Sequence, residues 1–545
     1  MKIEFENVLP AMRVNGKQNG TYNNEELGMP GVLTTKDYRL GEFMHQLRNI
    51  IWDDRRLVFI DGKILACSKN WIRDHVHEMK AFIHWEYDIG SFLDFIIDTQ
   101  REDGQYYELI KQLDDRHWAM VDDDCRVFYR EDNLALVRLE LEADVEYLVV
   151  EGALDYYRVT GDTEWLVRVL PKLEKGIEYD LSSPKRFDAA TGLIKRPFTI
   201  DTWDFFYEPE NHSKSAPDRR ISSDTPMSVM HGDNTGVYQA MNTLAFFNRK
   251  LGNAEKADMW ESRAEKLKEN IFRYLYNGRF FIHQLHLGHD GADGLESERL
   301  SLSNAYALNR GIFTTEEKRR VIEAYLSLKE KTGYFAEWFS IYPPYEDFIG
   351  YKPGQYVNGA ISPFTAGELA KGAFSCGYEE YGWDIISRFV SMRERDGKIF
   401  FLYSPIDCTP QDKQGPSAWG AAALLSAIDE GLAGITDLDT GYRMLGFSPR
   451  FVVTPYTELR YITGYEKTGT KVDVRFIVKD GGMRYDVSSP ATEVRAHIML
   501  PKGKHAAEVY VGGAPAEYVV TDVFGSEYVD FTSDGRGFSV EIIFG

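Results

Sequence analysis

Apolar residues recur at the 3.6-residue spacing of amphipathic helices along most of the chain between residues 35 and 434. Strand-like runs are scarce in this stretch, and polar, aromatic-rich segments separate the periodic ones. The pattern predicts helices over residues 38–52, 75–99, 133–160, 164–179, 234–251, 254–275, 302–310, 315–330, 363–376, 379–393 and 417–431, and a short one over residues 106–113. So many helices must bury their apolar faces against one another, which predicts a mostly α fold for this part.

The joints between these helices are of two kinds. Residues 159–165 read Val-Thr-Gly-Asp-Thr-Glu-Trp, which ends one helix at a glycine and begins the next at a capping Asp or Thr. Residues 250–256 repeat the device, and such tight turns bring consecutive helices antiparallel. The alternate joints are long and span residues 53–74, 114–132, 182–232, 276–300, 332–362 and 394–416. If the helices close into a ring, all the long joints emerge on one face, where we expect the functional site.

Beyond Gly434 the pattern changes to short alternating or apolar runs separated by Gly and Pro turns. These runs cover residues 451–454, 459–463, 471–478, 493–500, 507–511 and 538–544. The spacing is typical of an antiparallel β-sandwich. We therefore expect two domains: residues 1–434, helical with an extended N-terminal segment, and residues 435–545, the sandwich.

Charge and cysteine content exclude several classes of partner. The formal net charge of -22 disfavours nucleic acid, because binding to phosphates depends on Lys and Arg. The four cysteines lie far apart without a CxxC pair, so we expect no metal site and no disulfide framework. The N-terminus lacks the apolar run of a signal peptide, and no apolar stretch is long enough to cross a bilayer. We expect a cytoplasmic protein with no membrane partner and no cofactor, and the oligomeric state stays open.

The first candidate motif is Trp71-Ile-Arg-Asp74, at the end of the first long joint. The planar fork of Arg73 beside the carboxylate of Asp74 forms a donor and acceptor pair that matches neighbouring sugar hydroxyls, with Trp71 as a rigid aromatic neighbour. The alternative is structural, because Asp74 is placed to cap a helix that begins at His75. His75 and His77 are not spaced as metal ligands on one helix face.

The second candidate lies in the longest joint, around Trp203-Asp204-Phe205. A carboxyl held against aromatic rings is partly desolvated, which raises its pKa and keeps it protonated as a general acid. Asp204 fits that requirement best among the acidic residues of the joint. A solvated acidic loop is the alternative.

These motifs resemble those of known carbohydrate-active enzymes. Trp71-x-Arg-Asp74 looks like the motif that begins the second helix in the glucoamylase family, and Trp203-Asp204 followed by Gly232-Asp-Asn resembles a pair found in trehalases and processing glucosidases. The loop of residues 354–363, with Tyr356 and Asn358, is similar to a glucoamylase loop. The strands after residue 444 look like the C-terminal sandwich of bacterial α-L-rhamnosidases. The resemblance implies the six-hairpin glycosidase superfamily and its (α/α)6 barrel.

Carried over residue by residue, the resemblance makes Arg73 and Asp74 the clamp on a terminal sugar, Asp204 the general acid and Asp233 a supporting residue. The sequence departs from the motifs of these families in the last long joint, where Phe401 occupies the place of the Glu that activates water. Inverting hydrolysis needs a base on the opposite face of the sugar. We rank Glu337, which has aromatic neighbours, and Asp407, in the same joint as Phe401, equally as the base.

Further aromatic residues in or beside the long joints are candidates for stacking on sugar faces: Trp118, Phe206, Trp338, Tyr356 and Trp419. Core packing is the alternative for each. The expected activity is an exo-acting, inverting glycosidase on a small carbohydrate, an α-glucoside by one likeness and an α-L-rhamnoside by the other. Because of Phe401, a phosphorylase of the same superfamily and a sugar-binding protein without catalysis stay open as alternatives.

Overall fold

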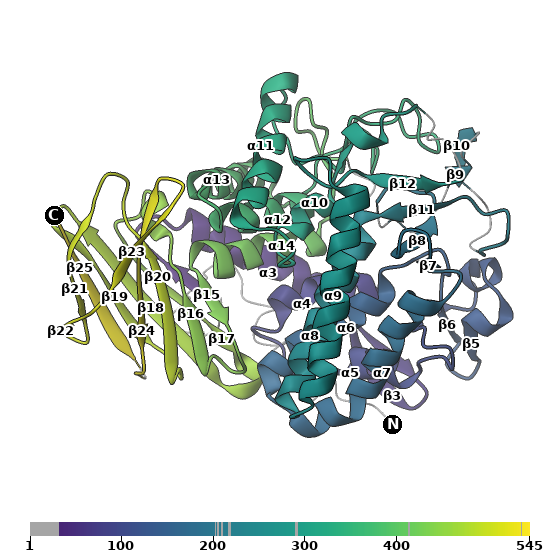
Figure 1. The fold of residues 1–545 in the computed structure, drawn as a ribbon, viewed down its shortest axis with the longest axis horizontal. Coiled ribbons are helices and arrows are strands. Elements are labelled where there is room, and N and C mark those ends of the chain that lie inside the picture. Colours follow the sequence, from purple (N-terminus) through teal and green to yellow (C-terminus); the bar gives the residue numbers. More distant parts are fainter. Residues whose placement is uncertain are drawn as a thin grey trace.

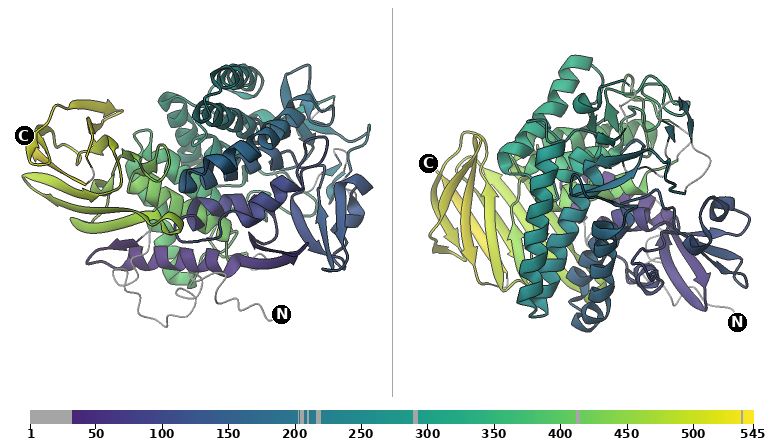
Figure 2. Two further views of the ribbon diagram at one scale, coloured as in Figure 1. Left: turned by 90° about the horizontal axis from the view of Figure 1, so that it is seen from below. Right: turned by 45° about the vertical axis from the view of Figure 1, so that its right-hand side comes forward.

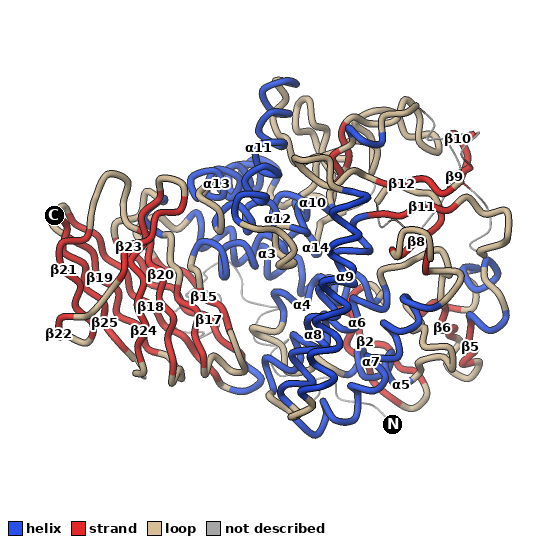
Figure 3. The backbone as a smooth tube through the Cα atoms, viewed as in Figure 1, coloured by secondary structure: helices blue, strands red, loops and turns tan. Residues whose placement is uncertain are grey.

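The computed structural model describes residues 32–201, 203, 207–208, 211–215, 220–288, 293–411, 415–535 and 537–545. A helical body occupies the middle of the molecule, with sheets at both of its ends (Figure 1, Figure 3). In the further views of Figure 2 the C-terminal strands again lie at one side of this body. Among the described residues, no helix combines the length and the apolar character that crossing a membrane requires.

Six helices of the body contact one another in a closed circuit: α4 (Ile72–Phe82), α6 (Val145–Thr160), α8 (His231–Lys250), α10 (Ser303–Ala307), α12 (Pro363–Phe374) and α14 (Ala418–Ser426). Each packs against the next, and α14 packs against α4. We call this set the inner ring. Glycines allow the close approach: a Cβ at Gly236 of α8 would lie 2.5 Å from the ring of Tyr147 on α6. A Cβ at Gly367 of α12 would lie 2.5 Å from the main chain of Ala423 on α14.

Further helices pack on the outside of the inner ring: α3 (Arg39–Asp54), α5 (Ser91–Asp98), α7 (Thr163–Ser182), α9 (Ala254–Leu275), α11 (Thr315–Thr332) and α13 (Glu379–Asp396). The tight turn predicted between α6 and α7 is confirmed. Gly161 ends α6 in the left-handed conformation with φ 60°, and the Asp162 carboxylate accepts a hydrogen bond from the Trp165 main-chain N–H at 2.9 Å. This local chemistry makes α6 and α7 antiparallel neighbours.

Several predicted helix bounds are wrong. Residues 106–113 and the beginning of the helix predicted over 133–160 instead form a small antiparallel sheet of β4 (Leu109–Gln112), β6 (Leu134–Val137) and β5 (Arg126–Tyr129). The helix predicted over 75–99 is interrupted between α4 and α5. A Cβ at Gly90, in this interruption, would lie 2.5 Å from the ring of Tyr156, so the chain passes too close to α6 for any larger residue.

The C-terminal region contains two sheets. One has the order β1 (Val32–Thr34), β17 (Glu458–Tyr465), β18 (Thr470–Lys479), β19 (Gly482–Ser488), β25 (Phe538–Phe544), β21 (Ala506–Val511) and β22 (Ala514–Pro515). The other has the order β15 (Ile435–Asp437), β16 (Met444–Phe447), β20 (Glu493–Met499), β24 (Ser526–Ser533) and β23 (Val519–Val523). Phe447 of the second sheet contacts the rings of Tyr485 and Phe538 in the first, with centroids 5.5 and 5.8 Å apart, so the sheets share an apolar core.

The two ends of the inner ring differ in what covers them. The C-terminal ends of its helices meet the C-terminal sheets: the His84 ring, just after α4, is bonded to the Gly464 carbonyl at 2.9 Å, and Gly441 N–H donates to the Arg158 carbonyl of α6 at 2.9 Å. The N-terminal ends follow the long joints. There a sheet of β7 (Phe187–Asp188), β8 (Leu193–Pro197), β11 (Met227–Met230) and β12 (Gln284–Leu287) lies at the far side of the body (Figure 3).

Candidate active site

Two of the carboxyls that the sequence singled out lie at the N-terminal ends of inner-ring helices. Each of these helices begins where a long joint ends, and a helix N-terminus carries a partial positive charge that favours carboxylates. Asp74 and Asp233 lie in the first turns of α4 and α8. Asp74 does not cap its helix, because α4 begins at Ile72 rather than at His75.

A cluster of aromatic side chains fills this end of the ring. We call it the aromatic cluster, and its members come from three long joints and three helices: Trp203, Tyr306, Tyr356, Phe364, Phe401 and Trp419. Phe364 lies between Trp419 and Phe401, with centroid distances of 5.0 and 5.2 Å. The Trp203 ring meets Tyr356 edge-on at 5.5 Å. Large aromatic faces arranged in this way can stack on the CH faces of a sugar ring.

Both tryptophans of the aromatic cluster have their polar ends bonded to tyrosines. Trp203 Nε1 donates to the Tyr356 hydroxyl at 3.0 Å, and Trp419 Nε1 donates to the Tyr306 hydroxyl at 2.7 Å. The ring of His77 from α4 stacks on Trp419 with centroids 4.3 Å apart. These bonds fix the orientation of the rings before any ligand binds, which lowers the entropy lost on binding.

Arg73 points toward the acidic start of α6. Its Nε and Nη2 atoms donate to the two oxygens of Asp144 at 2.6 and 2.9 Å, and it forms a further ion pair with Glu142. Arg73 is 8% exposed, so this forked pair is a buried one. The arginine fork that the sequence assigns to a sugar therefore already holds a carboxylate of the protein.

Asp74 has a different partner, Lys69. The Lys69 Nζ atom lies 3.5 Å from Asp74 Oδ1 and 5.8 Å from the centre of the Phe401 ring. Burial raises the pKa of Asp74, and Lys69 and Arg73 oppose this effect. Asp74 thus lies close to the residue that replaces the expected glutamate, with a lysine between them.

Asp233 is a fully buried carboxyl at the start of α8. Arg196 of β8 lies 3.6 Å from one of its oxygens, and neither oxygen accepts a hydrogen bond from any described residue. Burial raises the pKa of Asp233 to about 7, with Asp144 and Asp201 adding to the rise and Arg196 opposing it. Near neutral pH this carboxyl therefore exchanges a proton readily.

Asp201 and Arg196 anchor the part of the long joint that precedes Asp204. The Asp201 carboxylate accepts hydrogen bonds from the main-chain N–H of Ser303, at 3.1 Å, and from its hydroxyl. Arg196 Nη2 donates to the Trp203 carbonyl at 2.5 Å. Asp201 is therefore held against α10 of the inner ring, and the main chain of Trp203 is held by β8. Asp204 itself lies outside the described residues.

Glu337 lies in a buried ion pair with the outer helix α13. Its carboxylate accepts hydrogen bonds from Arg388 Nη1 and Nη2 at 3.0 and 2.8 Å and from the Tyr381 hydroxyl at 2.5 Å. The neighbouring Trp338 is fully buried beneath Arg388, 4.2 Å from its guanidinium carbon. The aromatic neighbours of Glu337 are thus part of a packed core, and neither residue joins the aromatic cluster.

Asp407 is exposed on its hairpin, and its Oδ1 accepts a hydrogen bond from the Thr409 hydroxyl at 2.9 Å. Hydrogen bonds from Ser404 and Thr409 lower the pKa of Asp407. It remains an ionised carboxylate that solvent can reach.

Three further candidates are engaged in local structure. Trp71 and Trp118 each pack against the core of the β4–β6–β5 sheet, and Trp118 Nε1 donates to the Leu113 carbonyl at 3.0 Å. The Asn358 amide nitrogen donates to the carbonyls of Tyr345 and Tyr351, at 3.0 and 2.8 Å, which closes the loop that carries Tyr356. Within the described ranges, no group of three or more metal-ligating side chains is arranged to hold a metal ion.

Lys69, Asp144 and Arg196 are residues of this site that sequence reasoning missed. The available signal was the acidic run Glu140-Leu-Glu-Ala-Asp144, which directly precedes α6 and therefore ends at the functional face. An acidic run of this kind is as typical of a solvated surface as of a functional site, so the partners of these carboxylates could not be assigned without the fold.

The comparisons with known proteins concern the same helical region and the overall fold. A family model described as Trehalase matches residues 153–338, and no curated protein matches the chain. An α-L-rhamnosidase from Dictyoglumus thermophilum is 12% identical with a TM-score of 0.58, over 94% of this chain and 50% of that one. A sialidase is 11% identical with a TM-score of 0.57, over 95% of this chain and 44% of that one. A GH78 family rhamnosidase of Bacillus sp. GL1 is 16% identical with a TM-score of 0.56, over 84% of this chain and 41% of that one.

At these identities the likeness to solved structures concerns the fold. The chain spans half or less of the length of these three proteins. The chain is therefore similar to the Trehalase family over residues 153–338 and shares its fold with these three solved structures.

Proposed function

We propose that the chain is an exo-acting, inverting glycoside hydrolase, and that the inner ring and its outer helices form an (α/α)6 barrel with the active site at the N-terminal ends of the inner helices. The observation that carries this proposal is that basic residues link the aromatic cluster to carboxyls: Arg196 donates to the Trp203 carbonyl and lies 3.6 Å from the buried Asp233, and Lys69 lies between Phe401 and the partly buried Asp74. Aromatic platforms beside carboxyls of differing pKa are what glycoside hydrolysis requires.

Asp204 is the proposed proton donor to the glycosidic oxygen. It follows Trp203, whose carbonyl accepts from Arg196 and whose ring belongs to the aromatic cluster. A desolvated carboxyl in such surroundings keeps its proton near neutral pH. Asp233 supports this role, because it holds Arg196 and so positions the segment that leads to Asp204.

Asp74 is the proposed base, with Asp407 as the alternative. A water-activating carboxylate must face the sugar from the side opposite the acid, in the region where Phe401 replaces the expected glutamate. Lys69 contacts both Asp74 and the Phe401 ring, whereas Glu337 already accepts three hydrogen bonds from Tyr381 and Arg388 of α13. Lys69 and Arg73 oppose the rise in the pKa of Asp74 that burial causes, and so favour its carboxylate form.

The first experiment follows the anomeric protons by NMR while the protein acts on a panel of α-glucosides and α-L-rhamnosides, with and without inorganic phosphate. Release of the inverted anomer, independent of phosphate, is the expected result. A sugar 1-phosphate formed only with phosphate would make the protein a phosphorylase. Sugar binding without turnover across the panel would leave a binding protein.

Variants then test the two roles. Asp204→Asn is expected to lower kcat at least about 100-fold, the usual scale for a lost general acid. Asp74→Ala is expected to be inactive until azide is added, because azide occupies the space of the missing carboxylate and gives a glycosyl azide of inverted configuration. Azide rescue of Asp407→Ala, with Asp74→Ala still active, would transfer the role of base to Asp407.

A further inference from the structure

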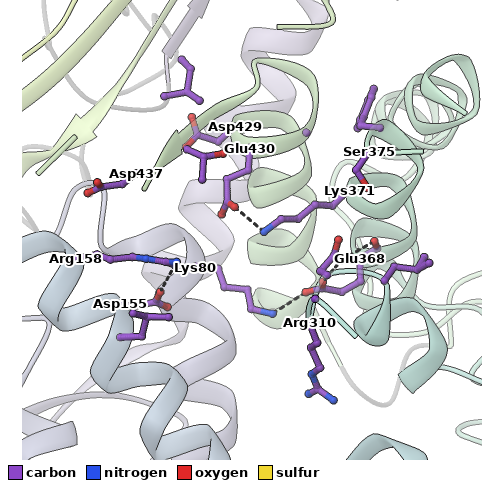
Figure 4. Close-up of a pocket in the computed structure, with 18 of the residues that line it drawn as sticks. Lys80, Asp155, Arg158, Arg310, Glu368, Lys371, Ser375, Asp429, Glu430 and Asp437 are labelled. Carbon is purple, nitrogen blue, oxygen red and sulfur yellow. Dashed lines mark hydrogen bonds and ion pairs between the residues drawn. The ribbon is translucent and has the colours of Figure 1, made fainter. Parts of the chain in front are cut away.

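A cavity of about 470 Å³ lies at the opposite end of the inner ring from the candidate active site. Its walls come from the C-terminal halves of α4, α6 and α12, and it is bounded by residues that lead into and form the C-terminal sheets (Figure 4). The volume is in the range of pockets that hold a small molecule. The cavity is separate from the aromatic cluster, although Tyr306 is a member of that cluster and also lines the cavity.

The cavity is lined by six acidic and six basic side chains, besides His84. Several face each other as ion pairs: Lys80 with Glu368 at 2.7 Å, and Lys371 with Glu430 at 2.9 Å. An anion or a cation that entered would have to separate these pairs, which is costly in a partly buried site. A neutral molecule would meet donors and acceptors already balanced.

The pairs offer adjacent donors and acceptors. Figure 4 shows Arg158 and Asp155 at the left of the space, and Lys371 reaching toward Glu430 from the right. The Arg158–Asp155 pair is long, 3.9 Å, so both groups retain hydrogen-bonding capacity. Burial raises the pKa of Asp155 to about 7, so its carboxyl can donate as well as accept. Vicinal hydroxyls, each a donor and an acceptor, match such walls.

Aromatic faces complete the lining. Tyr442 and Tyr465 stack on each other with centroids 4.8 Å apart, at the wall formed by the C-terminal region. Tyr306 stands at the inner end, with Lys80 Nζ 5.2 Å from its ring centre. Polar pairs with a few aromatic faces distinguish this cavity from the apolar pockets that take hydrophobic ligands.

We propose that this cavity is a second binding site, separate from the active site, for a neutral polyhydroxylated molecule of sugar size. The Lys371–Glu430 and Arg158–Asp155 pairs hold its hydroxyls from two sides, and the C-terminal sheets close the site.

The test is isothermal titration calorimetry of the full chain with D-glucose, D-mannose and L-rhamnose, and with inorganic phosphate as a charged probe. The active-site variant Trp203→Ala removes binding at the aromatic cluster, and it is expected to keep one sugar site per chain. Adding Lys371→Met with Glu430→Gln is expected to weaken that remaining site about tenfold or more, because hydrogen bonds to charged groups are lost. Arg158→Met, at a half-exposed position, is expected to weaken it in the same direction.

The matched control is Lys266→Met with Glu269→Gln, which removes an exposed ion pair of the same 2.9 Å length on α9 and is expected to leave sugar binding unchanged. Thermal melting of each variant checks the fold. Loss of all sugar binding in Trp203→Ala would overturn the proposal, as would unchanged binding in both cavity variants. Phosphate binding in place of sugar would also overturn it. These outcomes concern the cavity alone, so an inactive enzyme with a sugar in the cavity still supports a second site.

Discussion

Asp233→Asn is the substitution whose effect the structure defines most sharply. The carboxyl is fully buried, accepts no hydrogen bond from the described residues, and has Arg196 at 3.6 Å as its ion-pair partner. Burial raises its pKa from 3.8 to about 7, Asp144 and Asp201 add to the rise, and Arg196 opposes it. The folded protein therefore holds a proton here at a pH where the unfolded chain has released it.

The sign and size follow from this difference in bound protons. Between about pH 4 and pH 7 the folded state binds one more proton at Asp233 than the unfolded state, so the free energy of unfolding falls as the pH rises. The contribution is complete below the unfolded pKa and is lost as the pH passes through the folded value. A shift of roughly 3 pKa units at about 1.4 kcal/mol per unit gives about 4 kcal/mol in total. Asparagine does not titrate, so Asp233→Asn removes this dependence.

Urea denaturation followed by tryptophan fluorescence, at pH 4.0 and pH 8.0, measures the effect. The quantity compared is the free energy of unfolding of Asp233→Asn minus that of the wild type. This difference is expected to be larger at pH 8.0 than at pH 4.0 by up to about 4 kcal/mol, since the other groups titrate in both proteins and cancel. The control Asp534→Asn, at an exposed position, is expected to show a difference within about 0.5 kcal/mol. A difference below about 1 kcal/mol, or one of opposite sign, would refute the reasoning, because it would mean that Arg196 keeps the carboxyl ionised.

The other predictions concern packing and pairing. Burial alone would raise the pKa of Asp201, but the histidines and hydroxyls around it have the larger effect, so its pKa is lowered. Asp201→Asn should therefore reduce the free energy of unfolding by about 1–3 kcal/mol at pH 7, and by less at pH 3, in the same denaturation assay. Glu337→Gln removes the buried carboxylate partner of Arg388, which keeps the half-exposed Asp384 at 2.8 Å, and should lower the free energy of unfolding by about 3 kcal/mol with kcat retained; a tenfold fall in kcat would give Glu337 a catalytic role. Gly236→Ala should destabilise by about 1–3 kcal/mol through overpacking, measured by thermal melting, whereas Gly481→Ala, with no atom near its Cβ, should be close to neutral.

The helical part of the fold was predictable because its signals are local. Gly161 and Asp162 end one helix and begin the next with their own main-chain and side-chain bonds, whatever the rest of the chain does. The small sheet inserted before α6 was not predictable in this way. Leu134–Val137 is a four-residue apolar run that suits the start of a helix equally well, and its strand partner Leu109–Gln112 lies more than twenty residues earlier. Pairing between strands this far apart in the sequence makes residues 134–137 a strand, and the local apolar periodicity does not indicate that pairing.

The aromatic part of the candidate site was more predictable than the charged part. Trp203, Tyr356 and Trp419 come together because long joints open at one end of the ring, so their position follows from connectivity. The charged partners of Arg73 and Glu337 do not follow from connectivity. Each has a charged partner supplied by another helix, Asp144 for one and Arg388 for the other. Local sequence cannot distinguish a carboxylate tuned for chemistry from one neutralised in a core, since both have aromatic neighbours.

The charge balance at the N-terminal end of the inner ring connects stability with the proposed chemistry. Buried arginines and buried carboxyls face one another there: Arg73 pairs with Glu142 and Asp144, Arg138 pairs with Glu108 and Glu146, and Arg196 lies 3.6 Å from Asp233. Burial raises the pKa of Asp180 and of Asp233. A carboxyl is far less costly to bury with its proton than without it. The fold thus favours the protonated form of these two carboxyls at this end of the ring, and the proposed donation of a proton to a glycosidic oxygen requires the same protonated state of its donor.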